Sequence, residues 1–109
     1  RVLAFNWKLI STGIYLEIPE GYEVQVRSRS GLAAKYGLIV LNSPGTIDSG
    51  YRGEVNVILM NHNHFPYDDT KGDRIAQLVM APIIIAKIEE ITELSTTERN
   101  DGGFGSTGK

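Results

Sequence analysis

Two arginines precede a short run of helix-forming residues, an arrangement that can bind phosphate. Arg27 and Arg29 lie in RSRSG, which leads into SGLAAKYG at residues 30–37; there Ser30 is the candidate N-cap and Gly37 the candidate C-cap of a short helix. Free N–H groups at the helix start and two guanidinium groups would meet in one place. The alternative is a solvated basic strand end with an ordinary serine cap, and the motif alone leaves both interpretations open.

A glycine-rich segment, NSPGTIDSGYRGE at residues 42–54, places a carboxylate shortly before an aromatic ring. A tight hairpin can direct Asp48 and Tyr51 into one cleft, where the carboxylate orients a water molecule and the ring packs against a flat ligand. The alternative is that Asp48 bonds its own turn backbone and Tyr51 is a strand-edge aromatic.

Two further polar motifs lie in the second half of the chain. Arg74 and Gln77 follow a Gly-Asp turn in GDRIAQ. Their spacing puts them on opposite faces of a regular strand, so one ligand contacts both only at a bulge or around the turn. His62 and His64 form an H-x-H pair that can bind zinc, but no third ligand has a convincing spacing, and a polar hairpin tip is the favoured interpretation.

Short β-branched segments, separated by glycine and proline clusters, predict that an all-β sandwich or barrel positions these motifs. The polar segment 61–73 is expected to connect a second long hairpin. The strands are expected at residues 21–29, 38–41, 54–61, 74–82 and 83–92.

The segment 54–61 is apolar on both faces of the expected strand. Val55, Val57 and Leu59 share one face, while Ile58 and Met60 make the other face apolar too. A doubly apolar strand in so small a domain needs a second partner, and the simplest partner is another subunit.

The composition bounds the possible functions. The chain has 109 residues, a formal net charge of −2 and no cysteine, which predicts one domain and excludes disulfide scaffolds and thiolate chemistry. The acidic balance argues against nucleic-acid binding, so any anionic ligand must be met by local clustering of cations. No apolar run is long enough to span a bilayer, and a soluble, cytoplasmic domain without a membrane partner is expected.

The motifs RSRSG, GTIDSGYRGE, GDRIAQLV and GGFGSTG, in this order and spacing, resemble those of the trimeric dUTPase family, the deoxyuridine triphosphate nucleotidohydrolases. The resemblance implies an all-β, distorted jelly-roll (β-clip) subunit with one short helix, assembled as a homotrimer with active sites at subunit interfaces. It also implies hydrolysis of dUTP to dUMP and pyrophosphate with Mg²⁺ as cofactor. Residues 1–98 would form the β domain and residues 99–109 a glycine-rich active-site arm.

The resemblance also implies roles for individual residues. Asp48 is similar to the aspartate that activates the attacking water at the α-phosphorus. Tyr51 resembles the residue that packs under the deoxyribose and leaves no room for a 2′-hydroxyl, and Asn42 would read the uracil edge. The residues that match phosphate-binding positions, with Arg74 close by as support, are Arg29, Ser30, Gly31 and Gln77.

The tail RNDGGFGSTGK has the composition of a flexible linker, yet it contains one arginine and one phenylalanine. Arg99 matches the family's tail arginine that reaches the terminal phosphates, and Phe104 matches the aromatic that closes over the uracil ring. Gly105 and the neighbouring glycines let the backbone approach a nucleotide closely, so the arm is expected to act as a mobile lid.

The chain departs from the family pattern in two places. The family's Ala-Gly-x-Asp motif, whose aspartate helps hold the hydrated Mg²⁺, is not found, so no residue is assigned as a metal ligand. Ser28 stands where many members have proline, which is expected to loosen the loop slightly.

Two alternatives share the implied fold. The related dCTP deaminases need a glutamate on the strand after the hairpin, whereas VNVILMN contains no acid. A non-catalytic trimer that senses nucleotides or docks a partner protein stays open as the alternative function, because fold alone does not decide activity.

Overall fold

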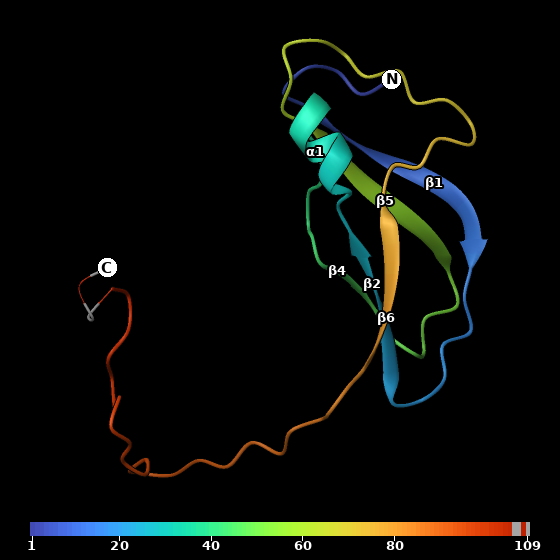
Figure 1. The fold of residues 1–109 in the computed structure, drawn as a ribbon. Coiled ribbons are helices and arrows are strands. Elements are labelled where there is room, and N and C mark those ends of the chain that lie inside the picture. Colours follow the sequence, from blue (N-terminus) through green and yellow to red (C-terminus); the bar gives the residue numbers. More distant parts are fainter. Residues whose placement is uncertain (106–107, 109) are drawn as a thin grey trace.

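Two small antiparallel sheets make up most of the fold in this computed structural model, which describes residues 1–105 and 108. The central strands are β5 (Glu54–Asn61) in the first sheet and β2 (Tyr22–Arg27) in the second. The flanking strands are β1 (Trp7–Tyr15) and β3 (Leu38–Val40) beside β5, and β4 (Gly45–Ile47) and β6 (Gln77–Pro82) beside β2. The mostly β architecture expected from the sequence is confirmed (Figure 1).

One short helix, α1 (Ser30–Tyr36), connects the two sheets in the chain. Its end matches the prediction, because Gly37 adopts a left-handed backbone with φ of 64° and its N–H bonds back to the helix. Its start does not. Ser30 is the first helical residue, and the N-cap position belongs to Arg29, which makes no side-chain cap bond. Within the described residues, no helix is long and apolar enough to cross a membrane.

The core lies where the alternating faces of the strands meet. Val55, Val57 and Leu59 of β5 are buried, as the alternation predicts, while the residues between them are half-buried. They form one cluster with buried residues of β2 and β3, so the cluster joins the two sheets. Each such side chain contributes about 1.5–3 kcal/mol on burial, which makes this cluster the main source of stability.

The expected second hairpin is wrong. β5 and β6 lie in different sheets, and β6 pairs with β2 from Tyr22↔Pro82 to Arg27↔Gln77. The physical reason is that β5 already has a neighbouring strand on both edges, β1 and β3. In the other sheet, β4 pairs with one edge of β2, and the opposite edge is open to β6. The strand also begins at Gln77 instead of Arg74.

The predicted strand at residues 83–92 is also wrong for this chain. After the N–H of Ile83 bonds the carbonyl of Gly21 at 2.9 Å, the chain runs away from both sheets (Figure 1). Ile84 and Ile88 are 96% and 93% exposed. Isoleucine favours strands because it packs well on a sheet, and here no neighbouring strand among the described residues offers that surface.

A buried asparagine holds the polar segment that follows β5. The Asn61 amide donates to the carbonyls of Val2 and Phe65 at 3.1 and 2.9 Å and accepts from the Asn63 N–H at 2.8 Å. Tyr67 pairs with Val2 in an isolated antiparallel bridge. The segment therefore folds back along the N-terminal residues before it reaches β6.

Candidate active site

The glycine-rich hairpin after β3 forms one wall of a cleft of about 290 Å³. Asn42, Asp48 and Tyr51 all line this cleft. A turn brings the last two together, because the Tyr51 N–H donates to the Asp48 carbonyl at 3.1 Å. Residues of the strands line it as well, namely Leu9, Val26, Val55, Asn56 and Ile58. The cleft thus combines two carboxylates (Asp48 and Glu54), two amides and apolar surface, which suits a flat ligand with a polar edge.

The base of the hairpin is tied to β1 through Glu54. Its Oε2 accepts hydrogen bonds from Ser11 Oγ at 2.6 Å and from the Gly13 N–H at 2.9 Å. These bonds lie at a register shift in β1 between Ser11 and Ile14. Glu54 also lines the cleft, but this carboxylate oxygen is already occupied by two donors. Sequence reasoning missed this support, because its partners lie far from it along the chain.

A second cavity, of about 660 Å³, brings two of the predicted phosphate-binding residues together. Arg29 and Arg74 both line it, along with residues of β1 and the segment 69–73. Arg29 is half-buried and Arg74 is exposed. Val55 lines both this cavity and the hairpin cleft. Lys71 lines the cavity too, as do the carboxylates of Asp69 and Asp73. The lining therefore holds three cations and two acids, a small local excess of positive charge that favours an anionic ligand.

The loop that carries Arg29 is anchored on both sides. Gln77 Nε2 donates to the Ser28 carbonyl at 2.9 Å, so Gln77 lies beside the RSRSG loop. Ser28 Oγ accepts from the backbone N–H of Val40 at 2.8 Å. A proline has no hydroxyl to make this bond, so the expected loosening is not what the local structure shows: Ser28 fastens the loop to β3.

Ser30 and Gly31 form the start of α1, and both are exposed. They follow Arg29 directly, yet neither lines the hairpin cleft or the arginine-lined cavity. Their backbone therefore lies next to the anchored loop, outside the two cavities.

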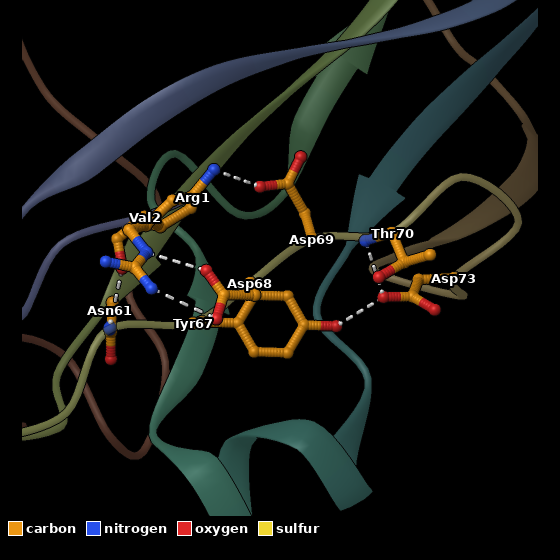
Figure 2. Close-up of polar contacts among 8 residues, drawn as sticks. All are labelled: Arg1, Val2, Asn61, Tyr67, Asp68, Asp69, Thr70 and Asp73. Carbon is orange, nitrogen blue, oxygen red and sulfur yellow. Dashed lines mark hydrogen bonds and ion pairs between the residues drawn. The ribbon is translucent and has the colours of Figure 1, made fainter.

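Tyr67 and Asp73 brace the segment that borders the arginine-lined cavity (Figure 2). The Tyr67 hydroxyl donates to Asp73 Oδ2 at 3.1 Å, and the Thr70 N–H donates to the same oxygen at 2.9 Å. Partial burial, followed by the contact with the Asp73 carboxylate, raises the pKa of Tyr67 above its ordinary value. At the other end of the segment, the Arg1 guanidinium lowers the pKa of Asp68, with which it forms an exposed ion pair.

The described part of the C-terminal arm, residues 99–105 and 108, does not line either cavity. Arg99 Nε donates to the carbonyl of Gly102 at 2.6 Å, and Phe104 is fully exposed. Gly105 has a φ of 83° in the turn that follows. The structure therefore keeps these three predicted site residues apart from the cleft, and residues 106, 107 and 109 of the predicted arm lie outside the described residues.

The two histidines take no part in a recognisable metal site. Over residues 1–105 and 108, no group of three or more histidine, aspartate or glutamate side chains could hold a metal ion. The His64 ring packs edge-on against Phe5, with 5.0 Å between the ring centroids.

The family model that matches this chain is described as dUTPase and covers residues 2–108. The chain belongs to the dUTPase family. The family expected from the sequence is thereby confirmed, and the hairpin cleft becomes the candidate active site of a dUTPase-family chain.

Relatives named deoxyuridine 5'-triphosphate nucleotidohydrolase are similar over most of the sequence. One from Nautilia profundicola is 61% identical over 102 residues, which is 94% of this chain and 72% of the relative. One from Rhizobium rhizogenes is 58% identical over 100 residues, which is 92% of this chain and 64% of the relative. The chain thus spans about two thirds of the length of these relatives.

Solved phage dUTPases share the fold. The Staphylococcus bacteriophage 80alpha dUTPase with dUpNHpp has a TM-score of 0.84 and 29% identity, over 99% of this chain and 79% of that one. A dUTPase mutant from phage phi11 of S. aureus, described as coordinating a structural Mg(II) ion, has a TM-score of 0.72 and 25% identity, over 84% and 76% of the chains.

The anchoring role of Ser28 predicts a stability effect. Ser28→Ala leaves the N–H of the buried Val40 without its partner, and we expect the free energy of unfolding to fall by about 1–3 kcal/mol. The matched control is Ser49→Ala, since the Ser49 hydroxyl makes no hydrogen bond within the described part of the chain. Urea unfolding followed by circular dichroism measures both, and an equal loss in the two variants would contradict the anchoring role.

Proposed function

We propose that this chain hydrolyses dUTP to dUMP and pyrophosphate at the hairpin cleft. The observation that carries the proposal is that Asn42, Asp48 and Tyr51 line one cleft in a chain of the dUTPase family. The relatives' name, deoxyuridine 5'-triphosphate nucleotidohydrolase, supports the same substrate.

Asp48 is the proposed general base. Its carboxylate is exposed at the cleft, so a water molecule can reach it. The carboxylate would accept a proton from that water as the water oxygen attacks the α-phosphorus, and the bond to the bridging oxygen of pyrophosphate would break. The products are then dUMP and pyrophosphate, with the oxygen of water on dUMP.

Asn42 and Tyr51 would select the nucleoside. The Asn42 amide offers both a donor and an acceptor, which the uracil edge requires, and a cytosine edge would leave such groups mispaired. The Tyr51 ring would pack against the deoxyribose and leave no space for a 2′-hydroxyl. The Tyr51 hydroxyl already donates a hydrogen bond to the Glu54 carbonyl at 2.8 Å, so the ring, and not the hydroxyl, would contact the sugar.

The phosphates require cations that the chain supplies locally. Arg29 and Arg74 line one cavity, and Gln77 holds the loop that carries Arg29. The exposed start of α1, at Ser30 and Gly31, adds backbone N–H groups directly after that loop. These groups would stabilise the charge that develops on the leaving pyrophosphate.

Mg²⁺ would bind at this site through the phosphates of the bound triphosphate. The described residues contain no cluster of three carboxylates or histidines, so they provide no protein cage for the ion. Mg²⁺ commonly binds through substrate phosphates with retained waters, and it would neutralise phosphate charge in that form. We therefore assign no protein ligand to the ion.

The arm, residues 99–109, would complete the site as a lid over the β domain, residues 1–98. In this structure Arg99 and Phe104 lie away from both cavities, so closure requires the arm to move or to reach another copy of the chain. In that closed state Arg99 would meet the terminal phosphates, and Phe104 with Gly105 would cover the uracil ring.

We further propose that the chain forms a homotrimer. The outer face of the first sheet places Trp7 beside Met60 and Leu9 beside Ile58. Trp7 and Leu9 are 56% and 55% exposed, so the described residues cover this apolar face only in part. Burial against other copies would remove it from water.

The assignment of Asp48 predicts the outcome of a substrate panel. With Mg²⁺, we expect pyrophosphate release from dUTP to be far faster than from dCTP, dTTP or UTP. Asp48→Asn should lower kcat by about 10²-fold or more, because the amide cannot accept the proton, while nucleotide binding is retained. Asp68→Asn, which changes only an exposed ion pair, is the matched control. Full activity of Asp48→Asn would contradict the role of the base.

The exposed apolar face predicts the mass in solution. Light scattering at micromolar concentration should give three times the chain mass of 12.0 kDa. Trp7→Glu should reduce the mass by placing a charge in the interface. Phe65→Glu, which places the same charge at another exposed apolar residue, should leave it unchanged, because Phe65 lies on the loop after β5 and not on the β1–β5 face. A monomer mass for the unchanged chain would overturn the trimer.

A further inference from the structure

The Tyr51 ring lies against Gly53, a residue without a side chain. A Cβ atom added to Gly53 would lie 2.5 Å from Tyr51 Oη, 2.6 Å from Cζ and 2.9 Å from Cε1. Contacts this short are essentially never made by real Cβ atoms, so any larger residue forces the ring or the backbone to move. The ring therefore occupies the space that a side chain at this position would fill.

The reason for glycine at this position is space and not backbone conformation. Gly53 is not among the glycines that have a positive φ, so its backbone is one that other residues adopt readily. Gly50, in the same hairpin, has no atom near its added Cβ and has no positive φ either. A comparison of substitutions at Gly53 and Gly50 therefore distinguishes the steric contact with Tyr51 from the general cost of replacing a glycine in this hairpin.

The Tyr51 ring is also held by a hydrogen bond to Glu54, the residue after Gly53. Tyr51 Oη donates to the carbonyl of Glu54 at 2.8 Å, and the Glu54 carboxylate is bonded to Ser11 and Gly13 of β1. The tip of the ring is therefore held by backbone that is itself tied to the first sheet. Tyr51 is 46% exposed and lines the cleft, so its position determines the shape of that wall.

We propose that Gly53 is a positioning residue for sugar specificity, because it provides the space in which Tyr51 packs at the correct depth in the cleft. This inference rests on the proposed function, in which Tyr51 contacts the deoxyribose. A displaced ring loses its fit to dUTP, whereas UTP, which already lacks that fit, loses less. The preference for dUTP over UTP therefore falls when Gly53 acquires a side chain.

The experiment compares kcat and KM for dUTP and UTP in five proteins: the unchanged chain, Gly53→Ala, Gly50→Ala, Tyr51→Ala, and Tyr51→Ala combined with Gly53→Ala. We expect Gly53→Ala to lower the dUTP-to-UTP ratio of kcat/KM by about tenfold or more, because small displacements at a reacting site have large effects. Gly50→Ala should keep the ratio within about twofold of the unchanged chain.

The double variant tests whether Gly53 acts through Tyr51. Once the ring is gone, the added methyl group has nothing to displace, so the double variant should match Tyr51→Ala in both constants. An unchanged ratio in Gly53→Ala would overturn the inference. The inference would also be overturned if Gly53→Ala lowered the ratio by the same factor in the Tyr51→Ala background as in the unchanged chain, since that result means a general backbone effect.

A spectroscopic measurement separates this inference from the proposed function. The ring resonances of Tyr51, assigned by their loss in Tyr51→Phe, should shift in Gly53→Ala and stay in place in Gly50→Ala. If the unchanged chain fails to hydrolyse dUTP, the proposed function falls, while unshifted Tyr51 resonances would overturn the positioning role on their own. If Gly53→Ala does not fold, recovery of folding in the double variant supports the steric contact, and failure of both variants overturns it.

Discussion

The candidate site depends on the burial of one strand face. Val55, Val57 and Leu59 of β5 point into the core, and this alternation forces the residues between them to the opposite face. Because β5 follows the hairpin directly, the same register determines where the hairpin leaves the sheet. A slip by one residue would exchange the two faces, bury Asn56 in place of a valine and move the cleft, so the core fixes the position of the chemistry.

Glu54 transmits this constraint from the sheet to the cleft. It begins β5, its carboxylate bonds the shifted region of β1, and its carbonyl accepts the Tyr51 hydroxyl. The wall of the cleft is thus built on regular structure instead of on a free loop. Rigid support of this kind is what a site needs if it is to distinguish ligands that differ by one hydroxyl.

Local pattern was sufficient where the determining contacts are local. Alternation predicted β2 and β5, a short apolar run predicted β3, and Gly37 marked the end of α1. The segment 83–92 failed because strand propensity says nothing about whether a partner edge exists. β6 was placed in the wrong hairpin because strand order depends on which edges remain open, a property of the whole fold.

In the candidate site, too, contacts within a short segment could be predicted, and contacts between distant segments could not. Asn42, Asp48 and Tyr51 share a cleft because one short hairpin carries them, so their proximity could be predicted. The supports could not be, since Glu54 bonds Gly13 across 41 residues and Ser28 bonds Val40 from a loop that has no characteristic pattern. The arm residues were assigned by motif alone, and a motif does not state the conformation in which they act.

In the proposed function, the hairpin cleft and the arginine-lined cavity together bind dUTP. Titration of the chain with dUpNHpp and Mg²⁺, followed by NMR of backbone amides, tests it directly. We expect saturable shifts that are largest at Asn42, Asp48, Tyr51 and Arg29, together with a change at Phe104 as the arm closes. Saturable shifts confined to other surfaces, or no binding at millimolar nucleotide, would contradict it.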